Sequence, residues 1–566
     1  MTNHGSRPLR GLESTQQSTI GTAKFGRMFR WLEPAQSPKN HNEQKELEAI
    51  FTLLAEEMVT TEFAGNVAKA GNPPPDSPLK QREPADENDT IPAGFTYFGQ
   101  FIDHDITFDP ASFLQQLNDP DATEDFRTPR LDLDCVYGRG PADQPYLYNK
   151  STGRRTFNEG TAIGIAGKDR RDVPRLSADN TAIIGDKRND ENKIVTQIQA
   201  LFLRLHNTVY AKIGARHQNN DTDDRFSQAQ RITRWCYQWI VLNDYLPKIC
   251  DEHVYLKIKP KTNDHKGPAF SHYGAHGEAY IPVEFAVAAF RFGHSMVRPS
   301  YSLNHTIQQG TGQFIDKDNV AHAFARIPIF VVKPNMQDVL ATDALNGFGN
   351  PIPPNWGIDW GFFFGELLTH PDGTENQIPQ PSYRIDTKLV DPLGDLPEFA
   401  AQHLEKLFVS LASRNLLRGV SMSLPSGQRI ARMMGHEPLT DVQLWNVRFD
   451  GDESESWTKG AQLFNDNRKW LEGSAPLWFY ILKEAELRDL PKDVSSTPAH
   501  HRKHFTHGRK LGLVGSTIVA ETLYGLAWSD HFSFLFQEPN WDPSKENIPG
   551  LTSDMDMLAL TTFVYP

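Results

Sequence analysis

The sequence is best read outward from residues 97–107, Tyr97-Phe98-Gly99-Gln100-Phe101-Ile102-Asp103-His104-Asp105-Ile106-Thr107. Three consecutive ionisable residues lie there between bulky apolar ones. Successive residues of a helix point about 100° apart, so Asp103, His104 and Asp105 would face three directions, and Gln100 would share a face with His104. The apolar flanks predict burial, and buried charges must be paired, bound to a metal or used covalently. Taken alone, the stretch favours a buried polar network that holds a helix in place.

The composition narrows the class of protein. The chain has 566 residues, of which 38% are hydrophobic and 23% charged, as is typical of a soluble globular protein. A net charge of −13 argues against a nucleic-acid partner, because neutralising phosphates needs a basic surface. The three cysteines are too few for a disulfide framework, and their spacing fits no zinc pattern. We see no secretory signal and no membrane span, so we expect a cytoplasmic or leaderless-secreted protein.

The pattern along the chain predicts a mainly α protein with long irregular connections and little β structure. Residues 1–45 are expected to form a polar, loosely ordered arm and residues 46–92 a helical lead-in. One large unit is expected over 93–566, with its core motifs in 95–435 and a helical part over 436–566. Helical spacing is present at 46–70, 191–251, 279–297, 396–416, 426–434, 459–488 and 513–527. Residues 109–190 and 315–400 are rich in breakers and predict long loops.

Three further motifs combine polar side chains with apolar surroundings. In Phe290-Arg291-Phe292-Gly293-His294, the glycine would let something flat approach the backbone beside the imidazole, as a haem-ligating helix requires. The alternative is a satisfied core histidine. Arg188 and Glu191 share a helical face, which is also typical of a surface ion pair. Asn415 and Arg418 recur three apart in an apolar helix, where a buried asparagine needs a specific partner.

The segment Thr128-Pro129-Arg130-Leu131-Asp132-Leu133-Asp134 carries oxygen donors at every second position. If the segment is extended, residues 128, 130, 132 and 134 share one side. A hydroxyl, carbonyls and two carboxylates form a hard, all-oxygen set, which suits Ca²⁺ and not zinc or copper. A solvated loop is the alternative.

Together, and in this order, the motifs resemble the peroxidase–cyclooxygenase superfamily, the animal-type haem peroxidases. The resemblance covers about residues 95–435, with a weaker echo at Lys510-Leu511-Gly512-Leu513-Val514-Gly515, and Leu424-Pro425-Ser426-Gly427-Gln428 looks most like bacterial members. The motifs are Gly99-Gln100-Phe101-Ile102-Asp103-His104-Asp105, Val136-Tyr137-Gly138, Asp186-Lys187-Arg188, Leu205-His206-Asn207, Phe290-Arg291-Phe292-Gly293-His294 and Asn415-Leu416-Leu417-Arg418.

The resemblance implies a single large haem peroxidase core of helices around a buried haem b. His104 would be the distal histidine that moves the peroxide proton, Arg188 would stabilise negative charge beside it, and Gln100 would line the distal pocket. His294 would be the proximal iron ligand, with Asn415 accepting the hydrogen of its other nitrogen. Arg418 and Arg291 would pair with the haem propionates.

The resemblance also implies a calcium ion and permits covalent haem. Asp105, pointing away from His104, would bind Ca²⁺ together with Thr128, Asp132, Asp134 and the backbone carbonyl of Arg130, where family members commonly carry an aromatic residue. Asp103 and Glu191 match the carboxylates that form ester links to haem. Asn192 replaces the methionine of the sulfonium link, so no sulfonium is expected.

The implied activity is reduction of H₂O₂ coupled to oxidation of small donors such as halides, thiocyanate or phenolic and aromatic compounds, in a protein expected to be a monomer. A fatty-acid dioxygenase or cyclooxygenase on the same fold is the main alternative, but its tyrosine three residues before the proximal histidine is here Arg291. A non-catalytic haem or calcium scaffold is the second alternative. The histidines at 500, 501, 504 and 507 are expected to lie in a solvated basic loop.

Overall fold

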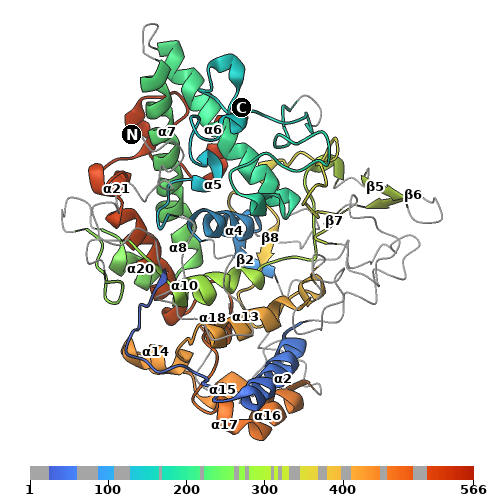
Figure 1. The fold of residues 1–566 in the computed structure, drawn as a ribbon, viewed down its shortest axis with the longest axis vertical. Helices are drawn as coiled ribbons and strands as arrows, with labels where there is room; N and C mark the ends of the chain where they lie inside the picture. The colour runs from blue at the N-terminus through green and yellow to red at the C-terminus, as the bar shows by residue number, and fades with distance from the viewer. Residues whose placement is uncertain are drawn as a thin grey trace, which may run out of the picture.

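The computed structural model describes residues 25–59, 87–107, 128–164, 168–216, 222–260, 267–274, 279–307, 312–315, 321–324, 326–330, 344–367, 379–394, 396, 409–445, 456–488 and 507–566. Its architecture is mainly α, as the sequence predicts (Figure 1). The α-helices are α2 (His41–Met58), α4 (Gly94–Ile106), α5 (Asp134–Tyr137), α6 (Lys193–Arg216), α7 (Thr222–Ile240), α8 (Leu246–Ile249), α9 (Glu252–Ile258), α10 (Val283–Val287), α13 (Leu411–Ser421), α14 (Gly427–Met433), α15 (Asp441–Trp445), α16 (Ser456–Asp466), α17 (Arg468–Leu471), α18 (Leu477–Leu487), α20 (Leu513–Ser529), α21 (Phe534–Gln537) and α22 (Met557–Val564).

Short helical turns and small ribbons of strand connect these helices. The 3₁₀ turns are η1 (Pro145–Leu147), η2 (Lys150–Thr152), η3 (Lys187–Asp190), η5 (Ala289–His294), η8 (Trp360–Phe362), η9 (Asp391–Gly394) and η11 (Pro543–Glu546), and η4 (Val241–Tyr245) is a π-helical turn. The described strands form two-stranded sheets: β1 (Phe25–Gly26) parallel to β3 (Ile281–Pro282), and three antiparallel pairs, β2 (Glu87–Pro92) with β8 (Pro381–Tyr383), β4 (Ser300–Tyr301) with β7 (Ile327–Pro328), and β5 (Gly312–Ile315) with β6 (Ala321–Phe324).

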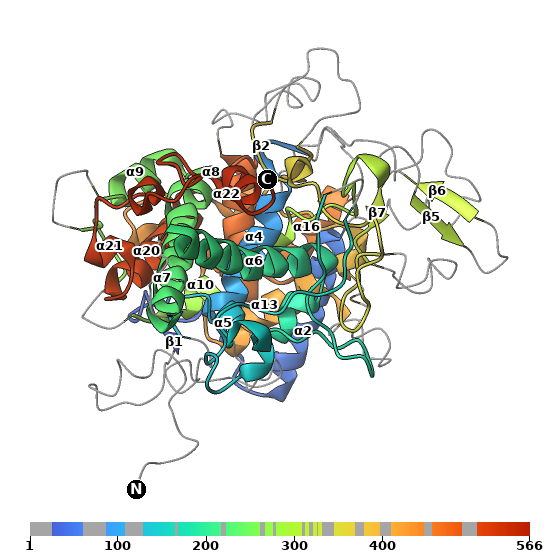
Figure 2. The ribbon, with the colours of Figure 1, turned by 90° about the horizontal axis from the view of Figure 1, so that it is seen from above.

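Helix α4 lies in the middle of the molecule with α6 alongside it (Figures 1 and 2). All its residues except Gln100 and Asp103 are buried, as expected of a helix that is apolar around its whole circumference. The ring of Phe101 stacks on Phe202 of α6 at 4.9 Å between centroids. A Cβ at Gly99 would lie 2.5 Å from the hydroxyl oxygen of Tyr245, so only glycine permits this approach. The aromatic packing therefore holds the rotation of α4 about its axis.

Three local expectations fail, each for a physical reason. Residues 279–297 form no continuous helix, because Ala288 (φ −130°, ψ −67°) breaks the chain between α10 and η5. Residues 128–134 are not extended, since Leu133 is left-handed at φ 59° and α5 begins at Asp134. The described end of the expected loose arm is packed, because Phe25, Met28 and Phe29 are buried apolar residues.

The remaining helical expectations are confirmed in outline within the described residues. Residues 191–251 contain α6, α7, η4 and α8, whereas residues 60–70 of the first expected helix and 397–408 of the fourth lie outside the described residues. Within the part of the chain that the structure covers, no helix is both long and apolar enough to cross a membrane.

Candidate active site

A cavity of about 580 Å³ lies between α4, η3, η5 and α13. This volume falls within the range of roughly 300–1,000 Å³ typical of small-molecule and cofactor sites. Nine of the residues singled out by the sequence line it, namely Gln100, Asp103, His104, Arg188, Glu191, Arg291, His294, Asn415 and Arg418. Segments far apart in the sequence thus converge on one space.

The imidazole of His104 is held from behind by a chain of amides. Its Nδ1 lies 2.7 Å from Oδ1 of Asn189, whose Nδ2 donates to Oε1 of Gln199 at 2.8 Å. Nε2 of Gln199 donates in turn to the carbonyl oxygen of Cys135 at 3.3 Å. Because Oδ1 of Asn189 can only accept, the proton of a neutral His104 lies on Nδ1. Burial, followed by the charge of Arg188, lowers the pKa of His104 to about 4.

Arg188 joins the end of α4 to the η3 turn. Its Nη2 donates to the carbonyl oxygens of His104 (2.9 Å) and Thr107 (2.6 Å) and to Oδ2 of Asp186 (2.8 Å). Asp186 also accepts the backbone N–H of Arg188 at 2.9 Å and so caps the η3 turn. The guanidinium is therefore fixed beside His104 at the wall of the cavity.

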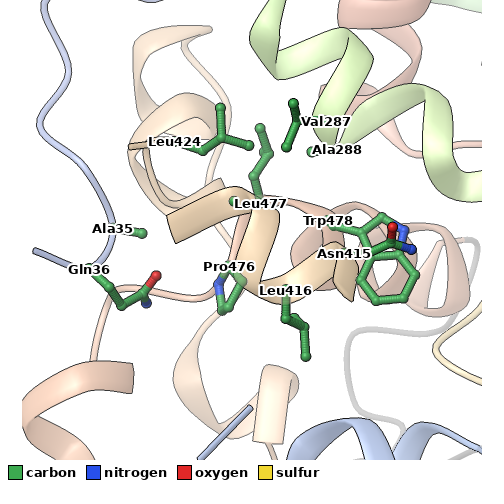
Figure 3. A pocket seen from close by; sticks show the side chains of 11 residues that line it. Ala35, Gln36, Val287, Ala288, Asn415, Leu416, Leu424, Pro476, Leu477 and Trp478 are labelled. Atoms are coloured by element: carbon green, nitrogen blue, oxygen red, sulfur yellow. The ribbon is translucent and has the colours of Figure 1, made fainter. Parts of the chain in front are cut away.

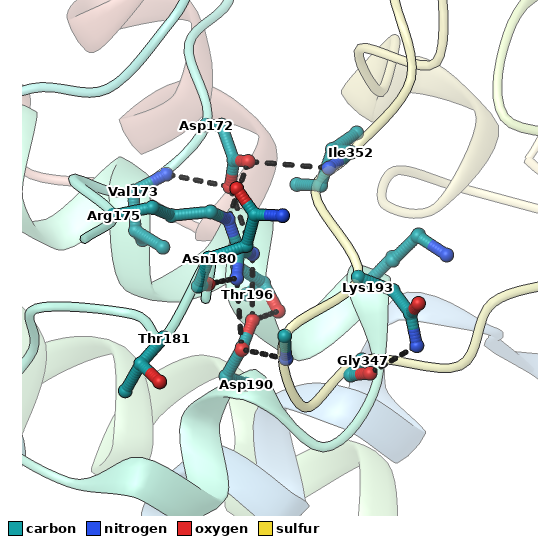
Figure 4. A network of polar contacts seen from close by, with 12 residues as sticks. Asp172, Val173, Arg175, Asn180, Thr181, Asp190, Lys193, Thr196, Gly347 and Ile352 are labelled. Atoms are coloured by element: carbon teal, nitrogen blue, oxygen red, sulfur yellow. Dashed lines mark hydrogen bonds and ion pairs between the residues drawn. The ribbon is translucent and has the colours of Figure 1, made fainter. Parts of the chain in front are cut away.

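A buried ion network anchors the other end of η3 (Figure 4). Arg175 donates to Asp172 at 2.8 and 3.2 Å and to Asp190 at 2.9 and 2.7 Å. Asp172 accepts the N–H of Ile352, and Asp190 the N–H of Gly349. Since Asp190 directly precedes Glu191, this network fixes the backbone that carries Arg188 and Glu191.

Elsewhere on the cavity wall, Nδ1 of His294 lies 2.8 Å from Nδ2 of Asn415 on α13. The sequence predicts that Asn415 accepts a hydrogen bond from His294. Oδ1 and Nδ2 of an amide are interchanged by a rotation of 180° about the side-chain bond. With Oδ1 at this contact, Asn415 accepts the proton of a ring protonated on Nδ1. Burial and then Arg291 lower the pKa of His294 to about 3. Behind Asn415, a space of about 10 Å³ lies between Leu416 and Trp478 and is about large enough for one water (Figure 3).

Two carboxylates lie on the cavity wall near His104. Nε2 of Gln100 donates to Oε2 of Glu191 at 3.3 Å, and Oγ1 of Thr107 donates to Oδ1 of Asp103 at 3.1 Å. Arg414 lines the cavity together with Arg291 and Arg418. The cavity therefore carries both acidic and basic groups within a largely aromatic and aliphatic wall.

The expected calcium residues lie next to one another behind α4. Asp105 is fully buried, and its carboxylate accepts the N–H groups of Leu133 (3.1 Å) and Cys135 (3.4 Å). Oγ1 of Thr128 donates to Oδ2 of Asp134 at 3.2 Å, and Oδ1 of Asp132 is buried and has no hydrogen-bond partner among the described residues. Burial and then the charge of Asp132 raise the pKa of Asp105 to about 7.

These side chains do not form a preassembled metal centre. Across the described residues, no three acidic, histidine or cysteine side chains are grouped so that they could hold one metal ion. The guanidinium of Arg130 lies 3.7 Å from Asp530, and because arginine has no side-chain acceptor, only its backbone carbonyl could bind calcium.

Sequence reasoning missed Asn189, Gln199 and Arg414 as parts of the site, and it used Asn192 only to exclude a sulfonium link. Gln199 stands between Ile198 and Ala200 on α6, so a buried polar residue between apolar ones was the available signal there. Asn189 lies between Arg188 and Asp190 and offers no such pattern. Of the histidine cluster, residues 500, 501 and 504 lie outside the described residues, whereas His507 contacts Arg384.

Comparisons with known proteins relate part of this chain to a family. Residues 111–342 match the family model named Animal haem peroxidase. The chain is 30% identical over 188 residues to peroxinectin A of Dictyostelium discoideum (31% of this chain, 32% of the relative). It is 27% identical over 371 residues to dual oxidase 1 of Caenorhabditis elegans (63% and 21%) and 26% identical over 184 residues to thyroid peroxidase of Canis lupus familiaris (30% and 19%). The matches thus span about a fifth to a third of the length of these relatives.

Solved structures share the fold at low identity. Peroxidase A from Dictyostelium discoideum superposes with a TM-score of 0.52 at 16% identity, covering 91% of this chain and 88% of that one. Fatty acid alpha-dioxygenase from Oryza sativa gives 0.50 at 14% identity, covering 90% and 76%. The fold alone therefore does not separate a peroxidase from a dioxygenase. The family match and these relatives therefore show that part of the chain is similar to animal haem peroxidases.

Proposed function

We propose that this chain is a haem peroxidase that reduces H₂O₂ and oxidises small donors, namely halides, thiocyanate or phenolic and aromatic compounds. One observation carries the proposal. His104 and His294 both line the same cavity, and each ring is held through Nδ1 by an asparagine side chain. That arrangement leaves Nε2 of each ring available, one for proton transfer and one for iron.

The cavity fits haem b in its chemistry. A Cβ built at Gly293 meets no atom within 4 Å, so the backbone beside His294 is open to a flat ligand. Nε2 of His294 would bind the iron, and Arg418 and Arg291 would pair with the propionates. Bound haem would supply the iron that binds peroxide and exchanges electrons with the donor.

His104 and Arg188 would carry the proton and charge chemistry. Because its pKa is lowered to about 4, His104 is neutral near pH 7, and its Nε2 can take a proton from one peroxide oxygen and return it to the other. The fixed guanidinium of Arg188 would stabilise the negative charge that develops as the O–O bond breaks. Gln100 would help to order water or a halide beside His104.

Asp103 and Glu191 could form ester links to the haem, and Asn192 offers no sulfonium link. Both carboxylates line the cavity, which supports this proposal. Extraction into acidified organic solvent is the test: esterified haem stays with the protein, whereas complete transfer of haem to the solvent would contradict the links.

A Ca²⁺ ion would be held by Asp105, Thr128, Asp132, Asp134 and the carbonyl of Arg130. The support is the all-oxygen donor set and the buried Oδ1 of Asp132, which has no hydrogen-bond partner in the described part of the chain. Metal analysis should find one calcium per chain. Chelation should lower the free energy of unfolding by about 3 kcal/mol where calcium exceeds its dissociation constant 100-fold. A calcium-free protein with unchanged stability would contradict the site.

Absorption spectra of the purified protein with and without H₂O₂ test the main proposal. His294→Ala should abolish haem binding, whereas His104→Ala should retain haem and slow the reaction with peroxide by about 10²- to 10⁴-fold. His253→Ala, at an exposed position on α9, is the control. Full peroxidase activity in His104→Ala would overturn the mechanism and leave the scaffold alternative.

A fatty-acid dioxygenase is the second candidate, favoured by one observation. Tyr97 lines the cavity, and its ring packs edge-on against Tyr301 at 5.3 Å, although position 291 holds arginine. Oxygen uptake with linoleate or arachidonate in the absence of peroxide, at high turnover, would favour this alternative over peroxidase activity.

A further inference from the structure

Residues 25–29, which we call the strap, lie against the part of the chain that leads to His294. In Figure 1 the segment before α2 runs in blue from α10 past α14. The first two residues of the strap form β1, which pairs with β3, and β3 directly precedes α10. The chain then continues through α10 and η5 to His294. The strap is therefore bound to the element that presents this histidine.

A buried carboxylate on α10 holds the next part of the strap. Glu284 is 0% exposed, and its two oxygens accept the backbone N–H groups of Met28 at 3.0 Å and Phe29 at 3.1 Å. Burying a carboxylate costs free energy unless hydrogen bonds compensate for the lost water. The attachment of the strap and the burial of Glu284 therefore stabilise each other.

Arg27 attaches the strap to a second element of the site. Its guanidinium donates to the backbone carbonyl oxygens of Met422 and Ser423, both at 3.1 Å, directly after the end of α13. Helix α13 carries Asn415, the hydrogen-bond partner of His294. The strap thus connects the element that leads to His294 with the element that carries its partner.

The strap also supplies part of the cavity wall. Phe25 is 5% exposed, and its side chain lines the cavity. Ala286 and Val287 of α10 and Met422 after α13 line the same cavity, so both elements that the strap connects add apolar side chains to it. Apolar side chains that cover a large flat ligand remove it from water, at about 25 cal/mol per Å² of apolar surface.

The same segment has a further attachment at residues that do not line the cavity. Arg429 of α14 donates to the carbonyl oxygens of Glu33 at 3.0 Å and Pro34 at 2.6 Å. Among the described residues that line the cavity, none of these three is found. Both Arg27 and Arg429 are partly buried, and each donates to two successive carbonyls. The two arginines therefore differ chiefly in whether they hold the cavity wall.

We propose that the strap retains haem in the cavity, with Phe25 as a haem-contacting residue and Arg27 and Glu284 as positioning residues. Detachment of the strap from α13 would uncover one side of the cavity and speed the loss of haem. A ligand that binds the closed form stabilises it, so bound haem should slow the local opening of the strap. The inference rests on the proposed haem-binding function and adds to its cofactor site a segment expected from sequence to be a loose arm.

The test compares Arg27→Met with Arg429→Met as the matched control. Methionine keeps an unbranched apolar chain and removes the guanidinium donors. Transfer of haem from each haem-loaded variant to an excess of haem-free myoglobin gives the rate of haem loss. Hydrogen exchange of the peptide that contains the amides of Met28 and Phe29, with and without added haemin, reports the opening of the strap independently of enzymatic activity.

Arg27→Met should raise the rates of haem loss and of this amide exchange by about tenfold, whereas Arg429→Met should change both by less than about twofold. Phe25→Ala, which removes a ring from the cavity wall, should also speed haem loss. Equal haem loss in the two arginine variants, or amide exchange at Met28 and Phe29 that haem does not slow, would overturn the inference. Absence of a haem absorption band in the unsubstituted protein would overturn the proposed function as well, so the two failures are distinguishable.

Discussion

Replacing Asn189 with leucine should show how much of the activity depends on the orientation of His104, because the histidine itself is kept. Leucine has a similar size to asparagine but cannot accept a hydrogen bond. The change removes the 2.7 Å contact to Nδ1 of His104 and the 2.8 Å contact to Gln199. It leaves a buried N–H and a buried amide oxygen without these partners.

The magnitude follows from those two groups. Each unsatisfied buried group costs about 1–3 kcal/mol, so Asn189→Leu should lower the free energy of unfolding by roughly 2–6 kcal/mol. The lost bond also biases the His104 tautomer by about 1–1.5 kcal/mol, or about tenfold, and a misplaced ring adds up to about 10²-fold. Because these factors multiply, the rate of reaction with H₂O₂ should fall by about 10- to 1,000-fold, and by less than in His104→Ala.

The assay is stopped-flow absorbance of the haem-loaded protein mixed with excess H₂O₂, below the unfolding temperature of every variant. Asn189→Asp retains an acceptor for Nδ1 and should keep most of the rate, whereas Gln199→Leu, one bond further away, should lose less than Asn189→Leu. Reaction at the unsubstituted rate in a haem-loaded Asn189→Leu protein, or equal losses in the Asp and Leu variants, would refute the reasoning.

Three further predictions test the surrounding structure. Burial lowers the pKa of His206 from 6.5 to about 4, so the folded state favours the neutral ring. About 3 kcal/mol of stability, present above pH 6.5, should therefore be lost as the pH falls toward 4. In His206→Phe, the free energy of unfolding in urea should depend less steeply on pH. Gly293→Leu should abolish haem retention without lowering the melting temperature of the haem-free protein, because a Cβ there meets no atom within 4 Å; normal haem loading would contradict the proposed haem position. Arg175→Leu should lower the free energy of unfolding in urea by about 3–5 kcal/mol, since it leaves two aspartates buried and uncompensated. Arg139→Leu, which breaks an exposed ion pair, should change it by less than about 1 kcal/mol; equal losses would refute the network's role.

Helical periodicity predicted part of the geometry of α4. Residues at 100° intervals were expected to face three ways; in the structure Asp105 is buried against Leu133 and Cys135, whereas His104 and Asp103 both line the cavity. The pattern was informative because most side chains of this central helix are apolar, so its few polar side chains identify the faces that meet polar surroundings.

The prediction from alternating oxygen donors was wrong for the backbone of residues 128–134. Its same-side geometry was predicted for an extended strand, yet the chain turns at Leu133, and Thr128 still reaches Asp134 by folding back. Likewise, apolar spacing over 279–297 indicated one helix, because side-chain pattern does not encode the backbone break at Ala288.

The sequence by itself determined which residue types carry the chemistry, and in which direction α4 presents them, because both depend on local covalent geometry. Only the tertiary structure decided the partners, namely Asn189 behind His104 and the packing that joins His294 to the same cavity. These contacts join segments such as 104 with 189 and 294 with 415, and such long-range pairings arise from how the whole core packs.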